Sequence, residues 1–265
     1  MPPPADRPIR TSRLKLPLGT IFWHEVGQGQ PVVLLHGTWA DSTQWLPVIH
    51  RLGANYHCIA PDLLGFGESS AASVPYAIAV EVESLHSLLA ALRLGRCLLV
   101  GHSLGAWVAV QYALGYPDQV QGVVILEPEG VEPGGGQGRW RCDRALTSPL
   151  SPFNWGIRGL SWLHYPRLKA LRQRQRQWDQ APAARRLLFQ RRSAELRSEL
   201  VQDQLADLQP PVVVLDPGQE QDLAPQRTQA FLKAAPQAHH QPRAGNTLPE
   251  AIAVGLHMLT KESGP

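Results

Sequence analysis

A serine between two glycines is the residue pattern with the clearest chemical meaning in this sequence. The segment Gly101-His102-Ser103-Leu104-Gly105 has the form G-x-S-x-G and follows an apolar run at residues 97–100. A sharp strand-to-helix turn can lift such a serine above a sheet, where glycines avoid a collision of Cβ atoms. The N-terminus of the following helix favours developing negative charge. We therefore predict that Ser103 is a catalytic nucleophile; a purely structural turn is the alternative.

A second apolar run, at residues 32–35, ends in the loop His36-Gly37-Thr38-Trp39. Backbone N–H groups of this loop, together with that of Leu104, can form an oxyanion hole for the negative oxygen of a tetrahedral intermediate. We expect Thr38 and Leu104 to supply the two donors. His36 is expected to order the loop, and a role as catalytic base is the alternative.

Alternating strands and helices are predicted to position these residues. Strand-like patterns occur at residues 20–26, 31–35, 56–60, 96–101, 120–126, 211–215 and 238–241, and helix-like patterns at 78–94, 104–115, 225–235 and 249–260. Fully apolar strands between helices predict an α/β fold with a mostly parallel, doubly wound sheet that is covered on both faces.

The domain organisation follows from where this pattern breaks. Residues 1–17 are rich in proline and arginine and are predicted to form a loose N-terminal arm. Residues 18–130 and 209–265 form the predicted α/β core. Residues 131–208 begin with a glycine-rich hinge and contain no convincing strand, so we expect a helical cap or lid. Such an insertion normally lies over the carboxyl ends of the strands, where open α/β sheets bind ligands.

Taken together, these segments resemble the α/β-hydrolase fold family, in its esterase, lipase and thioesterase-like branch. The resemblance extends to residues 60–69 (APDLLGFGES), which are similar to the family's D-x-x-G-x-G-x-S segment, and it covers about residues 20–260. It implies the α/β-hydrolase sheet with an inserted lid. The serine at position 103 differs from the aspartate that the dehalogenase and epoxide-hydrolase branches have there.

The resemblance also implies a catalytic acid in the loop after the strand at 211–215, because the family's triad runs serine, acid, histidine along the chain. Asp222 stands in the acid position of this loop. Glu220 is a weaker alternative, and Glu127, after the preceding strand, is weaker still.

The family's histidine position is occupied by Asn246. Asparagine cannot accept the serine proton at neutral pH. His239, His240 and His257 are alternative bases, but the first two are expected within a strand and the third late in the final helix. Loss of the base costs about 10⁶-fold in kcat, whereas an oxyanion hole and binding alone leave about 10³–10⁴ over water. If Asn246 is the native residue, we expect a weak or inactive enzyme. If Asn246 is an engineered replacement, the protein from which it was made is an ordinary serine hydrolase.

Aromatic residues near the proposed site indicate an apolar pocket. Trp39 and Trp107 lie close in sequence to the oxyanion loop and the nucleophile, and we expect both to bind substrate. Four of the eight tryptophans fall in the inserted block, together with other aromatic residues: Trp140, Phe153, Trp155, Trp162, Tyr165, Trp178 and Phe189. They favour a hydrophobic ester, thioester or terpenoid-like ligand, with packing inside the lid as the alternative. No G-x-G-x-x-G or Walker loop follows a strand, so no cofactor is expected.

Charge is distributed unevenly along the chain. Residues 139–208 contain 14 basic and 6 acidic residues, a net charge of +8, and the whole chain has a net charge of +3, so the remainder carries −5. Solvated helix faces explain this most simply. Docking of the basic block to a membrane or partner is the alternative, and the aromatic and basic residues of the segment 153–171 would suit a membrane interface. The overall charge does not indicate nucleic-acid binding.

Composition excludes several protein classes. With 43% apolar and 18% charged residues, the chain is too apolar for intrinsic disorder. Three widely spaced cysteines do not indicate a disulfide framework or a metal site. Since the N-terminus lacks the apolar region of a secretory signal, a cytoplasmic location is expected.

Three functions are consistent with the sequence. The first is a serine hydrolase acting on a hydrophobic ester or thioester. The second is a non-catalytic protein of the same fold that binds a hydrophobic small molecule. The third is a scaffold whose basic lid docks to a membrane or partner.

Overall fold

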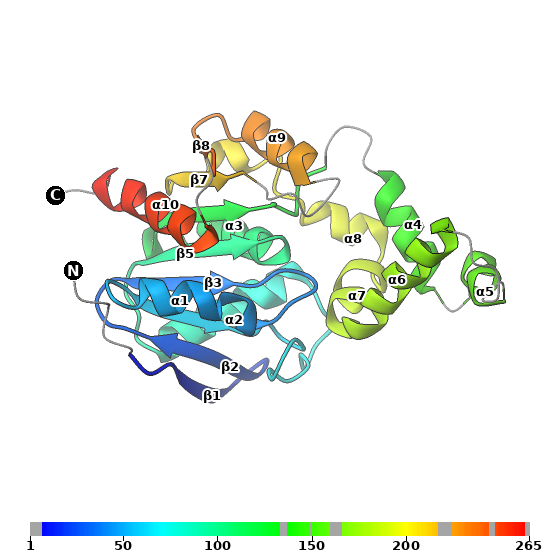
Figure 1. The fold of residues 1–265 in the computed structure, drawn as a ribbon, viewed down its shortest axis with the longest axis horizontal. Coiled ribbons are helices and arrows are strands. Elements are labelled where there is room, and N and C mark those ends of the chain that lie inside the picture. Colours follow the sequence, from blue (N-terminus) through cyan, green and yellow to red (C-terminus); the bar gives the residue numbers. More distant parts are fainter. Residues whose placement is uncertain are drawn as a thin grey trace.

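The computed structural model describes residues 7–132, 137–148, 150–159, 166–216, 224–243 and 247–262. Its centre is a sheet of eight described strands in the order β1-β2-β4-β3-β5-β6-β7-β8 (Figure 1). The strands are β1 (Arg10–Leu16), β2 (Gly19–Val26), β3 (Pro31–Leu35), β4 (His57–Pro61), β5 (Cys97–His102), β6 (Val120–Leu126), β7 (Val212–Leu215) and β8 (His239–Gln241). The pairs β1–β2 and β2–β4 are antiparallel and the other pairs are parallel. The predicted mostly parallel α/β sheet is confirmed.

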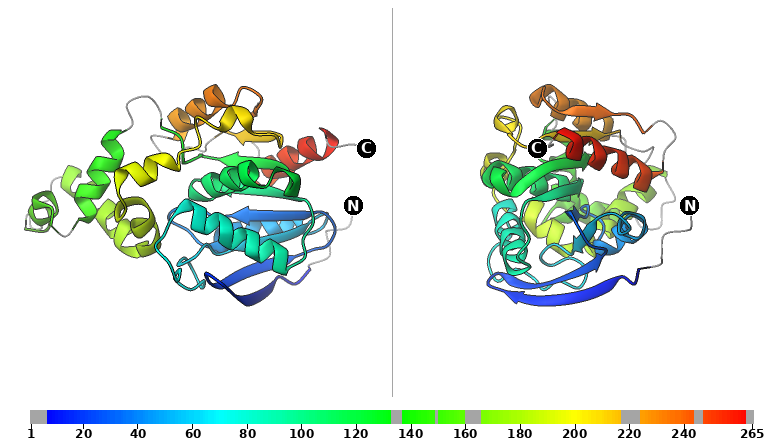
Figure 2. Two further views of the ribbon diagram at one scale, coloured as in Figure 1. Left: turned by 180° about the vertical axis from the view of Figure 1, so that it is seen from behind. Right: turned by 90° about the vertical axis from the view of Figure 1, so that its left-hand side faces the viewer.

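Helices cover both faces of this sheet (Figures 1 and 2). One face packs against α1 (Leu46–Leu52) and α10 (Leu248–Glu262), and the other against α2 (Ile78–Ala91), α3 (Leu104–Gly115) and α9 (Ala224–Ala234). Short 3₁₀ helices occur at Ser42–Trp45, Pro117–Gln119 and Leu205–Asp207. None of the described helices combines the length and apolar composition needed to cross a bilayer.

The central strands are buried on both sides because helices lie above and below them. In β5, Leu99 faces the core under α2 and α3, while Leu98 and Val100 face the core under α1 and α10. The neighbouring strands β3, β6 and β7 alternate in the same way and consist mainly of valine and leucine. Such continuous apolar strands are typical of a parallel sheet with two helical layers.

The prediction of a loose arm over residues 1–17 is wrong for residues 10–16, which form β1 at the edge of the sheet. Alternate residues of β1 are half-buried, and Leu14 and Leu16 pack against the core. Arg13 lies over the Phe22 ring, with its guanidinium carbon 5.4 Å from the ring centroid, and forms an ion pair with Glu68. Charged residues are usual on an edge strand, where they oppose pairing with other chains, and here they mask the strand pattern.

Five described helices lie between β6 and β7 in the chain: α4 (Gln137–Thr147), α5 (Pro152–Gly159), α6 (Pro166–Gln180), α7 (Pro182–Phe189) and α8 (Ser193–Ser198). We call them the inserted helices. They form a group at one end of the molecule, opposite α10 (Figures 1 and 2). Trp178 of α6 is buried between Trp39, which follows β3, and Phe189 of α7, with ring centroids 4.1 Å and 4.5 Å apart. This aromatic contact joins the inserted helices to the sheet.

One buried carboxyl group in α2 makes stability depend on pH. Glu81 is 1% exposed, and its Oε2 accepts a hydrogen bond from the Leu64 N–H at 3.1 Å. Burial raises the pKa of Glu81 from 4.5 to about 8. The folded chain therefore binds a proton that the unfolded chain releases between these two pH values, so stability falls as pH rises through this window.

Replacement of Glu81 by glutamine removes this proton linkage. We expect the stability of Glu81→Gln relative to the parent to rise by about 1.4 kcal/mol per pH unit between pH 4.5 and about 8. Urea unfolding across this range measures the difference. Glu83→Gln, at an exposed position of the same helix, is the control. An unchanged pH slope in Glu81→Gln would refute the assignment.

Candidate active site

Ser103 lies in the turn between β5 and α3, in a backbone conformation that few non-glycine residues adopt. Its φ is 53° and its ψ is −112°. Its N–H donates to the Leu126 carbonyl at 3.0 Å, and its carbonyl accepts from the N–H groups of Ala106 and Trp107 at 3.1 Å and 3.2 Å. These bonds from β6 and α3 hold the strained turn in place, as is common at functional sites.

Both glycines around Ser103 are required by close backbone contacts. A Cβ atom on Gly101 would lie 2.5 Å from the Ala106 Cα, and one on Gly105 would lie 2.3 Å from the Leu35 carbonyl oxygen. The α3 helix therefore packs directly against the ends of β3 and β5. This contact explains why the G-x-S-x-G spacing occurs here.

Gly105→Ala is expected to destabilise the fold by about 1–3 kcal/mol because the added methyl group overpacks the contact with β3. Gly95→Ala serves as the control, since no atom lies within 4 Å of a Cβ at that position, and its effect should stay within about 0.5 kcal/mol. Urea unfolding midpoints compare the two variants. Equal stability of both would contradict the packing described here.

The hydroxyl of Thr38 is the polar neighbour of the Ser103 side chain. The distance between Thr38 Oγ1 and Ser103 Oγ is 3.3 Å, and both residues are buried. Within the described residues, the backbone N–H groups of Thr38 and Leu104 donate no hydrogen bond. Both N–H groups expected from the sequence as oxyanion donors are thus not used in hydrogen bonds of the described residues.

His36 holds the loop that contains Thr38. The Leu63 N–H donates to Nε2 at 3.0 Å, so Nδ1 carries the proton and donates to the Gly37 carbonyl at 2.9 Å. Burial lowers the pKa of His36 and keeps its ring neutral. Since both nitrogens are occupied, this geometry favours the ordering role over the alternative role as a base.

Asp62, which follows β4, joins the segment after β3 to the loop after β4. Its two carboxylate oxygens accept the N–H groups of Ser42 at 2.6 Å and Glu68 at 2.7 Å. Gly67 has a φ of 48°, and a Cβ atom there would lie 2.2 Å from Asp62 Oδ2. The Ser69 hydroxyl donates to the Asp62 carbonyl at 2.8 Å. The D-x-x-G-x-G-x-S segment therefore shapes the loop after β4.

A pocket with a volume of about 500 Å³ opens between these loops and the inserted helices. It is lined by Thr38, Trp39, Ala40, Asp41, Gly65, Phe66, Gly67, Gln177, Gln180, Ala181, Pro182 and Ala183. Thr38, whose Oγ1 lies 3.3 Å from Ser103 Oγ, is one of the lining residues, and Ser103 itself is not. Trp39, Phe66 and the segment 181–183 give it apolar walls, and the glutamines and Asp41 add polar groups.

The expectation that Trp107 binds substrate is not supported by its position. Trp107 is fully buried and is absent from the lining of this pocket. Its indole N–H donates to the Glu199 carbonyl at 2.9 Å, and a Cβ atom on Gly130 would lie 2.6 Å from its ring. One turn into α3, the side chain points under the segment after β6, so Trp107 contributes to the core.

A buried ion pair fixes that segment after β6. Arg227 Nη1 of α9 lies 2.9 Å from Glu129 Oε1, with both side chains at most 5% exposed. The Glu129 N–H donates to the Ser103 carbonyl at 3.3 Å. The sequence has no local pattern that predicts this pair, because the two residues are 98 positions apart.

The residues expected to complete a triad lie outside the described residues. Asp222, the alternative Glu220 and Asn246 all fall in the segments 217–223 and 244–246. Glu127, the remaining alternative acid, is buried at the end of β6 with a φ of 47°, and its Oε2 lies 3.7 Å from His102 Nε2. It therefore contacts the residue before Ser103.

Among the described residues, Ser103 Oγ forms its hydrogen bond with Thr38 and not with a histidine. His239 and His240 lie in β8, and His257 is exposed on α10. Through the strand register, His240 is level with Gly101 but three strands away, which corresponds to about 14 Å at about 4.8 Å per strand. Its Nε2 contacts Asp216 instead. His240 is therefore not placed to take the Ser103 proton.

Two cysteine thiols are also unsuited to attack a substrate. Cys58 and Cys97 are buried in β4 and β5, and burial raises the pKa of each thiol to about 12. Both remain protonated at neutral pH, and only a thiolate is a strong nucleophile.

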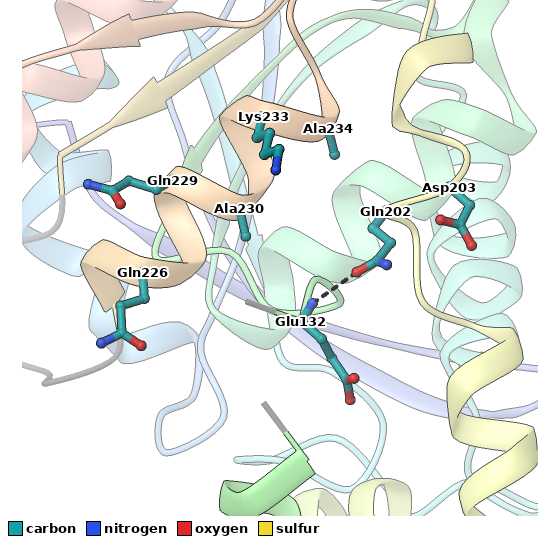
Figure 3. Close-up of a pocket in the computed structure, with 8 residues that line it drawn as sticks. All are labelled: Glu132, Gln202, Asp203, Gln226, Gln229, Ala230, Lys233 and Ala234. Atoms are coloured by element: carbon teal, nitrogen blue, oxygen red, sulfur yellow. Dashed lines mark hydrogen bonds between the residues drawn. The ribbon is translucent and has the colours of Figure 1, made fainter. Parts of the chain in front are cut away.

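A second pocket has polar walls, and Ser103 is not among its lining residues. It has a volume of about 640 Å³ and lies between α9 and the segments around residues 132 and 202 (Figure 3). Its walls are Glu132, Gln202, Asp203, Gln226, Gln229, Ala230, Lys233 and Ala234, and the Glu132 N–H donates to Gln202 Oε1 at 3.3 Å. Its polar walls do not suit a hydrophobic ester.

A comparison with protein families agrees with this geometry. The sequence profile of the alpha/beta hydrolase family matches residues 32–257. This chain belongs to the alpha/beta hydrolase family. Membership confirms the resemblance inferred from the sequence motifs.

Several curated proteins are similar in sequence to part of this chain. It is 35% identical over 163 residues to mouse 1-acylglycerol-3-phosphate O-acyltransferase ABHD5, a match that covers 56% of this chain and 44% of that protein. The chain spans less than half the length of the curated relatives it matches, with coverage of 31% and 44% in two examples.

Two solved structures share the fold over almost the whole chain. A thermophilic esterase from Thermogutta terrifontis has a TM-score of 0.67 at 22% identity, covering 96% of this chain and 98% of the esterase. A membrane phospholipase A described as a bacterial virulence factor has a TM-score of 0.71 at 18% identity, covering 95% and 87%. At these identities, the likeness shows a common fold.

Proposed function

We propose that this alpha/beta hydrolase is a slow serine hydrolase that acts on a hydrophobic ester or thioester. The observation that carries the proposal is the strained backbone of Ser103, with a φ of 53°, at the turn between β5 and α3. Four contacts from β6, α3 and the segment after β6 maintain this turn. Backbone strain of this kind is concentrated at functional sites.

In this reaction, Ser103 Oγ attacks the carbonyl carbon of the ester. The N–H groups of Thr38 and Leu104 donate to the oxygen that becomes negative, and the N-terminus of α3 adds to this stabilisation. Collapse of the tetrahedral intermediate expels the alcohol or thiol and leaves an acyl group on Ser103. Attack by water on this acyl group releases the acid and restores the serine.

Because the protein offers no efficient acceptor in this proposal, the Ser103 proton passes to water during attack, and water returns a proton to the leaving alcohol or thiol. Asp222 would orient a base at position 246, but the residue there is Asn246, which cannot take up the proton. The N–H donors and substrate binding remain, and they alone can sustain a rate about 10³–10⁴ over water. We therefore expect slow turnover.

The pocket next to Thr38 supports a hydrophobic acyl group as substrate. Trp39 and Phe66 line it, and its volume of about 500 Å³ lies in the usual range of about 300–1,000 Å³ for small-molecule sites. The similar esterase and phospholipase structures and the acyltransferase relative carry names of acyl-ester chemistry, which also supports this substrate class.

Hydrolysis of nitrophenyl esters of increasing acyl length tests the proposal. The parent chain should release nitrophenol above the rate of the buffer, with a preference for medium over very short acyl groups. Ser103→Ala should keep only the rate that the N–H donors and binding sustain without a nucleophile and should carry no acyl group on residue 103, and Ser73→Ala, at an exposed position, should behave like the parent chain. An acylated peptide in Ser103→Ala, or none containing Ser103 in the parent, would overturn the assignment of the nucleophile.

The second candidate function is binding without catalysis. It is favoured by Asn246 and by the absence of a histidine beside Ser103 Oγ among the described residues. A hydrophobic ester would then bind next to Trp39 and quench tryptophan fluorescence without being cleaved. Quenching in both the parent chain and Ser103→Ala, with no nitrophenol release by either, would favour this function.

A further inference from the structure

The exposed apolar side chains of the described residues are concentrated at one place. Five large apolar residues are exposed: Val74, Leu150, Phe153, Trp155 and Val254. Three of them lie within six positions, at and just before α5, with exposed fractions of 83% for Leu150, 44% for Phe153 and 63% for Trp155. Helix α5 forms the tip of the inserted helices, at the end of the molecule opposite α10 (Figures 1 and 2).

The orientation of α5 is the reverse of that expected for a helix on a protein surface. Its polar residue Asn154 is 5% exposed, while the aromatic residues on either side of it face outward. Asn154 Nδ2 donates to the Ser148 carbonyl at 2.9 Å, and Asn154 Oδ1 accepts from Gln175 Nε2 of α6 at 2.5 Å. These bonds, together with the buried Ile157, fix the helix so that Phe153 and Trp155 remain outside.

The inserted helices that carry this apolar tip have a positive net charge. Residues 139–208 carry a net charge of +8. Several exposed basic residues of the inserted helices have no acidic partner among the described residues: Lys169, Arg176, Arg186, Arg192 and Arg197. Basic residues near an anionic membrane are attracted to its surface.

We propose that the tip formed by Leu150, Phe153 and Trp155 docks this protein onto an anionic lipid bilayer. The three side chains enter the interface between headgroups and acyl chains, where tryptophan is enriched. The basic residues of the inserted helices bind the lipid phosphates. The combination of outward apolar side chains with a net charge of +8 in the segment 139–208 matches an anionic lipid surface, which takes up apolar side chains and attracts basic ones. This proposal is independent of catalysis by Ser103.

Sedimentation with lipid vesicles tests the proposal. The parent chain should bind vesicles of phosphatidylcholine mixed with phosphatidylglycerol and not vesicles of phosphatidylcholine alone. Binding should weaken as the Debye length falls from about 30 Å at about 0.01 M salt to about 10 Å at about 0.1 M. Absence of binding to the anionic vesicles at low salt, or equal binding to both vesicle types, would overturn the proposal.

Variants separate the tip from general electrostatic attraction. Leu150→Ser/Phe153→Ser/Trp155→Ser should lower the partition coefficient for anionic vesicles by about tenfold or more, because the apolar area that enters the bilayer is lost. Val74→Ser/Val254→Ser changes the other exposed apolar residues and should bind like the parent. The single variant Trp155→Ser should show a smaller decrease in the partition coefficient and replaces the triple variant if that does not fold. An unchanged partition coefficient in whichever of these variants is folded would contradict the role of the tip.

Discussion

Asn246→His is expected to raise kcat for a hydrophobic nitrophenyl ester by about 10²- to 10⁴-fold, the usual contribution of a positioned general base. Position 246 follows β8 and lies about two dozen residues beyond Asp222, where the family has its histidine. An imidazole there can take the Ser103 proton during attack and return it to the leaving group. Steady-state kinetics on the parent and variant measure the change.

The pH profile shows whether the new imidazole is responsible. The rate of Asn246→His should rise through a pKa near the usual histidine value of about 6.5, and the parent should lack this step. Ser103→Ala in the Asn246→His background should remove the whole gain. Asn246→Gln is the matched control because its side chain also cannot accept the proton. A gain that persists without Ser103 would show that another residue performs the reaction.

Arg227→Met is expected to destabilise the fold by about 3–5 kcal/mol, because it breaks the buried ion pair with the Glu129 carboxylate. The two atoms Arg227 Nη1 and Glu129 Oε1 are 2.9 Å apart in a site that is at most 5% exposed. Since the Glu129 N–H contacts the Ser103 carbonyl, the change should also lower the rate of ester hydrolysis. Urea unfolding and the ester assay measure both effects.

Arg51→Met is the matched control for this experiment. Arg51 also forms an ion pair, with Glu250 at 3.2 Å, but its side chain is 60% exposed. Loss of such a surface pair costs about 0–1 kcal/mol. If both variants lost the same stability, burial would not be the cause, and the structural role of the pair beside Ser103 would have to be abandoned.

The sequence predicted the parts of the site that depend on short segments. The turn around Ser103, the loop around Thr38 and the strands beneath them each have a local pattern, because a buried parallel strand must be apolar and a tight turn needs glycine at fixed positions. The family match confirms the fold that these patterns indicated.

Other features could not be predicted because they depend on contacts between distant residues. The charges of Arg10–Leu16 concealed the edge strand β1, and only its pairing with β2 reveals it. Trp107 is close to Ser103 in sequence, but the backbone of α3 directs it under Gly130. The outward aromatic face of α5 depends on hydrogen bonds of Asn154 to Ser148 and Gln175. Neither the helical pattern nor the composition predicts which way the side chains of Trp107 and of α5 point.

Covalent labelling of the nucleophile is the most direct test of the central claim that Ser103 attacks the substrate. A fluorophosphonate with an alkyl chain would be incubated with the parent and with Asn246→His, and the tryptic peptides would be analysed by mass spectrometry. The peptide of residues 97–139 contains Ser103 as its single serine and contains no threonine. We predict one phosphonyl group on Ser103, formed slowly in the parent and rapidly in Asn246→His. Labelling of another residue, or an unlabelled Ser103 in a folded Asn246→His variant, would contradict the account.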